Sequence, residues 1–343
     1  MVPGRLETPT GGYGYDRRIV AGLRASGWSV EVVELDGSFP QPSRSALDRA
    51  ARALAAIPDD TAVLIDGLAL GAMPAEVERE RSRLRLLAIV HHPLARESGI
   101  GLEIASALDA SERRALAAVR RVVVTSPATR EALASYGVDC DRVVVIEPGT
   151  DRAPVARGSG GATVHLLTVG SLVPRKGHDV LIGALARLRG ENWCLTCVGS
   201  LDRHPETAER VRQLIHAHGL GERVSLVGEV PESEMAGYYA RADVFVLPTL
   251  YEGYGMAVAE ALARGLPVIS TATGAIAEIA AGAGLLVPPG DPDALAGALL
   301  QVMTIPGLRD RLAAGARVAR ERLPRWDDAS RRMAEVVSVE IQR

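Results

Sequence analysis

The sequence predicts an α/β protein made of two doubly wound parallel-sheet domains that face each other across a cleft. Short apolar runs alternate with amphipathic helical stretches, which is the pattern of βαβ units. This alternation occurs twice, once on each side of a stretch rich in Gly and Pro near the middle of the chain. With 343 residues, of which 47% are apolar and 24% charged, the chain is long enough for two separate cores.

The first domain is expected at residues 1–150. Its predicted strands are residues 29–35, 61–66, 85–91, 121–126 and 142–147, with helices between them. A doubly wound domain normally opens on a buried strand, but here a helix is predicted directly after the loop TGGYGYD at residues 10–16. We therefore expect the first strand of this domain to be missing or clipped.

A second domain is expected at residues 163–323, after a linker at residues 151–162. Its predicted strands are the apolar runs VHLLTVG, CLTCVGS, RVSLVGE, DVFVLP, LPVIST and GLLVPP. The last stretch, residues 324–343, is predicted to be helical. Ligands of such domains bind at the carboxyl ends of the parallel strands.

Composition excludes several kinds of partner and places the protein in the cytoplasm. A net charge of -3 without a block of like charge gives no electrostatic footprint for nucleic acid. Three cysteines, an odd and sparse set, fit a reducing compartment better than a disulfide framework. No apolar stretch approaches the roughly 20 residues that cross a bilayer. Peripheral contact with the inner face of the membrane stays open.

A basic pair follows the first strand of the second domain. Gly170 ends the strand, and Arg175 and Lys176 stand just before a predicted helix in the segment GSLVPRKG. Cations at the carboxyl end of a parallel strand, beside the free amides of a helix start, suit a diphosphate. The alternative interpretation is a pair of solvated loop cations, which taken alone is the commoner case.

Two glutamates bracket another predicted helix start. Glu252 lies in a Gly-rich turn and Glu260 lies two helical turns further on, in LYEGYGMAVAEAL. Gly253 and Gly255 allow the backbone of this turn to approach a phosphate closely. A carboxylate in the turn can bind sugar hydroxyls, and one on the helix can bind a ribose. Taken alone, the two glutamates are weak evidence for a binding site, because a glutamate on a helix is usually just an exposed charge.

Taken together these motifs resemble the GT4 retaining glycosyltransferases of GT-B fold, over nearly the whole chain. The likeness rests on the E-x7-E spacing of Glu252 and Glu260, on ADVFVLPT before it and ALARGLPVI after it, on GSLVPRKG, and on VIEPGTD at the domain junction, all in the family's order. It implies two Rossmann-like domains, of which the first binds the acceptor and the second binds a nucleotide-sugar donor. It also implies that the helix at residues 324–343 crosses back to the first domain.

The resemblance also implies roles for individual residues. Arg175 and Lys176 would bind the donor diphosphate, Glu260 the ribose and Glu252 the transferred sugar. His91, with His92 in reserve, would contact the transferred sugar from the segment AIVHHPL. The catalytic set implied is thus His91, Arg175, Lys176 and Glu252. The full donor-binding set is Gly11, Gly12, Gly170, Arg175, Lys176, Gly228, Val230, Glu252, Gly253, Tyr254, Gly255, Met256 and Glu260.

The function implied is transfer of a hexosyl group, with retention, from a nucleotide diphosphate sugar to an acceptor. UDP-sugar is placed first and GDP-sugar second, while sugar, lipid, small metabolite and peptide acceptors all stay open. No metal or other cofactor is expected, because the DxD string from Asp291 to Asp293 is interpreted as a helix start with an Asp cap. The alternatives are a catalytically inactive nucleotide-binding partner subunit and a GT-B sugar-nucleotide epimerase.

Overall fold

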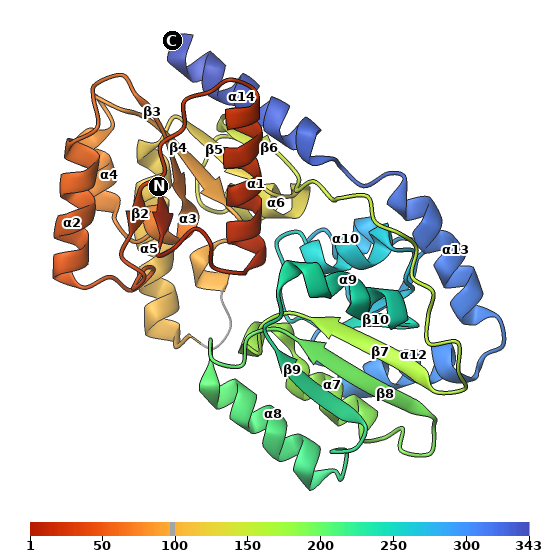
Figure 1. Ribbon diagram of the computed structural model, residues 1–343. Helices are drawn as coiled ribbons and strands as arrows, with labels where there is room; N and C mark the ends of the chain where they lie inside the picture. The colour runs from red at the N-terminus through yellow and green to blue at the C-terminus, as the bar shows by residue number, and fades with distance from the viewer. Residues whose placement is uncertain (97–99, 343) are drawn as a thin grey trace. The chain divides into compact units, whose positions relative to one another are not determined.

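A computed structural model describes residues 1–96 and 100–342 of the chain, which form two compact units (Figure 1). Unit 1 is Met1–Gly149 with Pro324–Arg343, and unit 2 is Thr150–Leu323. Each unit contains a parallel β-sheet with helices against it. The prediction of two doubly wound α/β domains is therefore confirmed.

The main sheet of unit 1 is four parallel strands in the order β3-β4-β5-β6. Its inner residues are short runs of Val, Leu, Ile and Ala, buried on both faces as strands of a covered parallel sheet require. The strands are β3 (Ala62–Asp66), β4 (Arg85–Val90), β5 (Arg121–Val124) and β6 (Val143–Val145). The helices are α1 (Gly11–Ala25), α2 (Arg44–Ala55), α3 (Gly67–Leu70), α4 (Pro74–Glu80), α5 (Leu102–Ala118) and α6 (Pro127–Ala134).

A two-residue strand opens the chain. β1 (Val2–Pro3) pairs in parallel with β2 (Glu34–Leu35), and the amide of Asp66 donates to the carbonyl of Met1 at 3.0 Å on its other side. The Gly-rich loop thus follows a strand, and a very short strand stands where the sequence predicted a missing or clipped one. The predicted strand 29–35 was wrong for residues 29–33, because the strand beside it offers only two residues for pairing.

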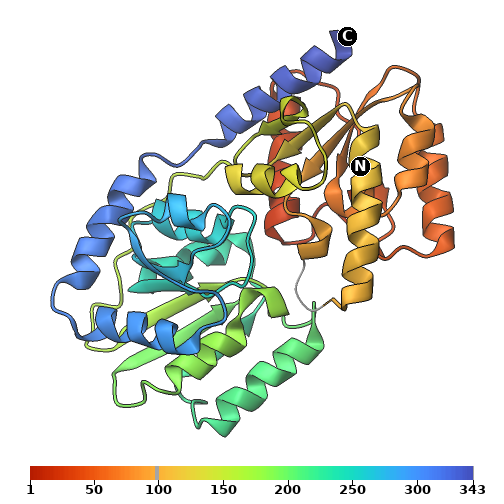
Figure 2. The same cartoon turned by 180° about the vertical axis from the view of Figure 1, so that it is seen from behind.

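The C-terminal helix α14 (Trp326–Gln342) packs on α1 within unit 1 (Figures 1 and 2). Met333 and Val337 are buried in this contact region. A Cβ on Gly22 of α1 would lie 1.9 Å from Oγ of Ser330, so only glycine permits the two helices to approach so closely. The guanidinium of Arg121 also donates to Glu340 at 2.7 Å, which ties the helix to β5.

Unit 2 holds a six-stranded parallel sheet in the order β12-β11-β10-β7-β8-β9. The strands are β7 (Val164–Val169), β8 (Trp193–Val198), β9 (Val224–Gly228), β10 (Val244–Leu247), β11 (Val268–Thr271) and β12 (Gly284–Val287). The helices are α7 (His178–Leu185), α8 (Pro205–Ala217), α9 (Glu232–Arg241), α10 (Met256–Ala263), α11 (Ile276–Ile279), α12 (Pro292–Thr304) and α13 (Leu308–Arg320). All six strands coincide with the predicted apolar runs to within two residues at each end, and β8 begins one residue earlier than predicted, at Trp193.

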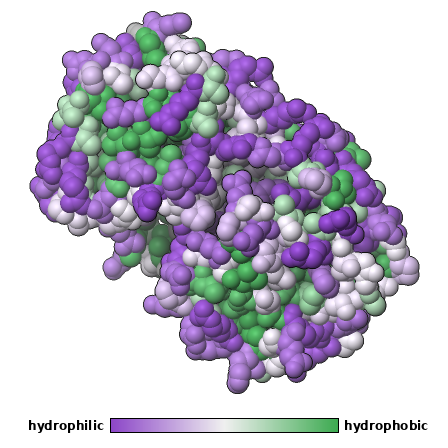
Figure 3. Space-filling view, viewed as in Figure 1, coloured by the Kyte–Doolittle hydropathy of each residue, from purple (hydrophilic) through white to green (hydrophobic). Residues whose placement is uncertain are grey.

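The segment before β7 runs along unit 2, with the amides of Ala156 and Arg157 donating to the carbonyls of Arg264 and Ala240 at 2.8 and 3.0 Å. Hydrophilic residues cover most of the face seen in Figure 3, and apolar residues gather in two patches, one on unit 1 and one over β8 and the edge strand β9 of unit 2. No helix within the described ranges combines the length and the apolar character needed to cross a membrane.

Candidate functional site

The strand order of unit 2 locates its ligand crevice. β7 is followed by β8 and β9 on one side, whereas β10, β11 and β12 extend the sheet on the other side. The connections therefore reverse direction between β7 and β10. In open α/β sheets ligands bind at the carboxyl ends of the strands at such a reversal. The candidate site of unit 2 consists of the loops that follow β7 and β10.

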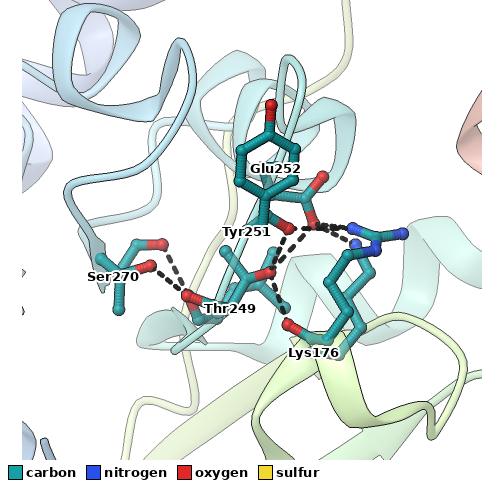
Figure 4. Close-up of polar contacts among 8 residues, drawn as sticks. Lys176, Thr249, Tyr251, Glu252 and Ser270 are labelled. Atoms are coloured by element: carbon teal, nitrogen blue, oxygen red, sulfur yellow. Dashed lines mark hydrogen bonds and ion pairs between the residues drawn. The ribbon is translucent and has the colours of Figure 1, made fainter. Parts of the chain in front are cut away.

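Arg175 and Lys176 lie in the loop after β7, within the 3-10 helix η3 (Pro174–Lys176). Nη1 of Arg175 lies 3.2 Å from Oε1 of Glu252, and the ammonium of Lys176 also donates to Oε1 (Figure 4). The side chains of Arg175 and Lys176 are only 17% and 16% exposed. Solvated loop cations are thus the wrong interpretation, because both cations are largely buried against one carboxylate oxygen.

The turn that carries Glu252 is in contact with Thr249 and with Gly274. The hydroxyl of Thr249 lies 2.9 Å from the carbonyl oxygens of Arg175 and Tyr251 and 3.3 Å from Oε1 of Glu252, so it links the two loops (Figure 4). Gly274 packs against the same turn. Its φ is +54°, and a Cβ there would lie 2.0 Å from the carbonyl oxygen of Glu252.

Glu260 is half-buried on α10 and is not the exposed helical charge that the weaker interpretation assumed. The hydroxyl of Tyr239, on α9, donates to its Oε2 at 2.9 Å. Burial raises the pKa of Glu260, and the Tyr239 hydrogen bond opposes that effect.

Of the other residues expected in the donor site, those of unit 2 lie at or after the carboxyl ends of β7, β9 and β10. Gly255 caps the N-terminus of α10 with φ +95°, and Met256 is the first residue of that helix. His178, which sequence reasoning did not single out, begins α7 beside this loop; burial and the charge of Lys176 lower its pKa to about 4, so it is neutral. The residues that complete the unit 2 part of the expected set are Gly170, Gly228, Val230, Gly253 and Tyr254.

In unit 1, His91 joins two buried carboxylates that sequence reasoning missed. Its Nε2 lies 3.5 Å from Oδ1 of Asp16, on α1, and 3.4 Å from Oδ2 of Asp66, at the end of β3. His91 itself follows β4, the neighbour of β3. The sequence contained a hint of this cluster. TAVLID is a predicted strand that ends on Asp66, and the Gly-rich segment TGGYGYD ends on Asp16.

The side chains of Asp16, Asp66 and His91 influence one another's charge. Burial works against a charged imidazole, but the nearby carboxylates of Asp16 and Asp66 raise the pKa of His91 to about 10. Burial raises the pKa of Asp16 to about 6, whereas His91 lowers the pKa of Asp66 in spite of burial. His91 is therefore an imidazolium at neutral pH. Within the described ranges these three residues form the one group that could hold a metal ion, with ligand atoms within 4.8 Å of one another.

Gly12 has a packing role beside this cluster. A Cβ at Gly12 would lie 3.2 Å from Cδ2 of His91, so a larger residue would crowd the ring. Gly11, the first residue of α1, follows the cap Thr10, whose hydroxyl accepts from the amide of Tyr13. Of the two adjacent histidines, His91 rather than His92 is the member of the cluster.

The DxD string is a helix start, as the sequence predicted. The carboxylate of Asp291 accepts from the amides of Asp293 and Ala294 at 3.0 and 2.9 Å and caps α12.

Two family models match the chain. Residues 17–153 match the model for glycosyltransferase family 4, and residues 163–304 match the model for glycosyl transferases group 1.

Curated relatives carry glycosyltransferase names. A D-inositol 3-phosphate glycosyltransferase from Xylanimonas cellulosilytica is 32% identical over 68% of this chain and 60% of the relative. An MMP alpha-(1->4)-mannosyltransferase from Mycolicibacterium hassiacum is 27% identical over 92% of this chain and 80% of the relative. The chain thus matches only about 60% of the length of the first of these relatives.

Solved structures share the fold. A sucrose-phosphate synthase from Thermosynechococcus elongatus superposes with a TM-score of 0.82 at 23% identity, covering 98% of this chain and 97% of that one. Anabaena HepE in complex with UDP and glucose gives a TM-score of 0.75 at 19% identity, with 98% of each chain covered. One family match covers mainly unit 1 and the other lies within unit 2, and the chain belongs to glycosyltransferase family 4, with the GT-B fold.

Proposed function

We propose that this protein is a retaining glycosyltransferase that moves a hexosyl group from a nucleotide diphosphate sugar to an acceptor without using a metal ion. One observation carries the proposal. Arg175 and Lys176, from the loop after β7, meet Glu252, from the loop after β10, at the reversal point of the unit 2 sheet. Two cations and a carboxylate at that point suit a diphosphate and the sugar attached to it.

The two cations would replace the metal ion that other transferases use to neutralise the leaving group. When the bond from the anomeric carbon to the donor phosphate breaks, negative charge grows on the diphosphate and positive charge on the sugar. Arg175 and Lys176 are already held in place, and each preorganised group of this kind contributes on the order of 3 kcal/mol to lowering a barrier. The amides that begin α10 at Met256 add a further attraction for phosphate.

Glu252 would exchange partners as the donor binds. In the structure its Oε1 accepts from both cations, so the phosphate oxygens of a donor compete with it for the same groups. A displaced Glu252 carboxylate can accept hydrogen bonds from hydroxyls of the transferred sugar. Binding of the diphosphate thus prepares the carboxylate for the sugar.

Retention follows if the acceptor attacks the face that the diphosphate leaves. The acceptor oxygen forms the new bond to the anomeric carbon, the old bond to the phosphate oxygen breaks, and that phosphate oxygen takes the acceptor proton. No enzyme carboxylate has to act as a nucleophile in this scheme. Glycosidases that retain configuration instead place two carboxylates about 5 Å apart across the scissile bond.

His91 is assigned a hydrogen bond to the transferred sugar, on the strength of the family resemblance. As an imidazolium it can donate a proton in a hydrogen bond, but it has no lone pair with which to act as a general base at neutral pH. Asp16 and Asp66 compensate its charge. This arrangement supports a role in orienting the sugar rather than in activating the acceptor.

Uridine is placed first among the bases and guanosine second. The solved HepE structures contain UDP, UDP with glucose, or UDP-glucose, which supports this order without deciding it for this chain. The acceptor stays open between sugar, lipid, small metabolite and peptide.

Calorimetric titration of UDP, GDP and ADP tests the proposal, in magnesium and in EDTA. The native chain should bind one nucleotide in EDTA, and Arg175→Ala should weaken that binding at least tenfold. Arg210→Ala, which removes an exposed cation on α8 of the same unit, is the control and should bind as the native chain does. Binding of no nucleotide, or binding only with magnesium, would overturn it. Binding without turnover across a panel of acceptors would favour an inactive partner subunit.

A further inference from the structure

A buried tyrosine holds the carboxylate to which the ribose is assigned. Tyr239 lies on α9 and Glu260 on α10, and the tyrosine hydroxyl donates to Oε2 of Glu260 at 2.9 Å. The ring of Tyr239 is fully buried. It stacks with Phe245 of β10 at a centroid distance of 6.1 Å, and the guanidinium of Arg264 lies 4.3 Å from its centroid.

These contacts leave the hydroxyl of Tyr239 with little freedom. A ring packed in this way cannot swing out, so its hydroxyl is a fixed donor. Arg264 also donates from Nη1 to the backbone carbonyl of Glu260 at 2.9 Å, which anchors the backbone of the same residue. Tyr239 and Arg264 therefore act on the side chain and on the backbone of Glu260 respectively.

The two oxygens of Glu260 differ as a result. Oε2 is occupied by Tyr239, whereas Oε1 has no hydrogen-bond partner within residues 1–96 and 100–342 and is not among the fully enclosed polar atoms. A half-buried carboxylate with one oxygen held and the other available can accept a hydrogen bond in a defined direction. The hydroxyls of a ribose are donors of the right kind.

We propose that Tyr239 is a positioning residue that fixes Glu260 so that its Oε1 distinguishes a ribonucleotide from a deoxyribonucleotide. The inference rests on the proposed function, in which Glu260 binds the ribose of the donor. Without the tyrosine hydroxyl the carboxylate gains rotational freedom and loses a preferred direction. The ribose contact is then weakened, while the diphosphate contacts of Arg175 and Lys176 stay intact.

The experiment compares UDP, 2′-deoxy-UDP and 3′-deoxy-UDP by calorimetry, on the native chain, on three single variants and on one double variant. The guanosine series replaces the uridine series if GDP is the nucleotide that binds. Tyr239→Phe removes only the hydroxyl. Tyr238→Phe removes the hydroxyl of the preceding residue, whose ring faces Arg241 instead, and serves as the matched control. Glu260→Gln removes the charge of the carboxylate. It serves as the reference for losing the contribution of the Glu260 carboxylate to ribose binding.

The native chain and Tyr238→Phe should bind UDP about tenfold more tightly than at least one of the two deoxy analogues. Tyr239→Phe should reduce that ratio to about twofold, by weakening UDP and leaving the deoxy analogue unchanged. In the double variant Tyr239→Phe with Glu260→Gln the two losses should not add, because both changes remove one contact. Thermal unfolding checks that each variant is folded.

Each other outcome overturns the inference at an identifiable step. Full discrimination by folded Tyr239→Phe would show that Glu260 reads the ribose without the tyrosine, and the proposed function would stand. Equal affinity of the native chain for UDP and both analogues would show that the ribose is not read here. Binding of no nucleotide at all would remove the proposed function, and the inference with it. If Tyr239→Phe weakened UDP and the deoxy analogues equally, the hydroxyl would have a purely structural role.

Discussion

Nε2 of His91 lies 3.4 Å from Oδ2 of Asp66, so the residue that follows β4 faces the last residue of β3 across neighbouring parallel strands. Asp16 approaches the same nitrogen from α1 at 3.5 Å. One imidazolium thus balances two carboxylates that are nearly inaccessible to water. The cluster constrains what His91 can do in any reaction of this protein.

His91 should stay protonated throughout the neutral pH range. Its folded pKa of about 10 lies above its ordinary value of 6.5, so its contribution to stability is fully present below pH 6.5 and is lost as the pH rises through about 10. NMR titration of the imidazole carbons, assigned with His91→Gln, should show no transition for His91 between about pH 6 and 8. Asp66→Asn should bring the transition down towards this range. A native midpoint near 6.5 would contradict the charged cluster.

Glu252→Gln should bind UDP several-fold more tightly than the native chain, because the carboxylate no longer competes with phosphate for Arg175 and Lys176. Lys176→Met should instead weaken UDP by about tenfold or more, since it removes a charged donor. Calorimetry of both variants separates the two effects. If Glu252→Gln weakened UDP as much as Lys176→Met does, Glu252 would be a ligand of the diphosphate region rather than a competitor.

Gly274→Ala should destabilise unit 2 and displace the turn that carries Glu252. The added Cβ would lie 2.0 Å from the carbonyl oxygen of Glu252, so the loss should reach at least about 3 kcal/mol. Gly219→Ala is the matched control, because Gly219 has a similar φ of +62° and no atom within 4 Å of the added Cβ. It should cost only about 1 kcal/mol from backbone strain. Chemical denaturation measures both, and equal losses would refute a specific contact with the turn.

Removal of divalent metal should leave the protein unchanged. Arg175 and Lys176 supply the positive charge for the proposed diphosphate site, and protonated His91 supplies it between Asp16 and Asp66. Dialysis against EDTA should therefore alter neither the thermal midpoint nor the affinity for UDP. A rise in the midpoint on adding Zn²⁺ or Mn²⁺, absent from Asp16→Asn, would show that the cluster of Asp16, Asp66 and His91 binds a metal ion after all.

Much of the fold could be read from local patterns. Each strand of unit 2 is a short, mainly apolar run that contains Val, Leu or Ile, and a buried parallel strand requires such a run whatever its neighbours are. Strand 29–35 was the exception. The length of this strand depends on its partner strand β1, which has only two residues. The residues at 29–33 carry no information about the length of β1.

The candidate site was only partly predictable for the same reason. Arg175, Lys176, Glu252 and Glu260 stand in recognisable local motifs at strand ends and helix starts, so their positions could be inferred. Asp16 and Asp66 belong to no local motif that marks a binding site. They become part of the candidate site only because α1 and β3 place them next to His91. Nothing in the local sequence distinguishes Tyr239 from other residues of α9. Its role depends on the packing of α9, which places the tyrosine hydroxyl against Glu260.

The sequence by itself determined the two doubly wound domains, most of their strands, the basic pair after β7 and the two glutamates of the Gly-rich turn and helix. Periodicity and turn residues act over short stretches of chain, so these features could be read locally. Only the tertiary structure decided which charges meet. Glu252 holds both Arg175 and Lys176, Tyr239 holds Glu260, and two carboxylates hold His91. These pairings join residues that are distant in the chain, and Coulomb attraction and hydrogen bonding depend on distance in space rather than on separation in sequence.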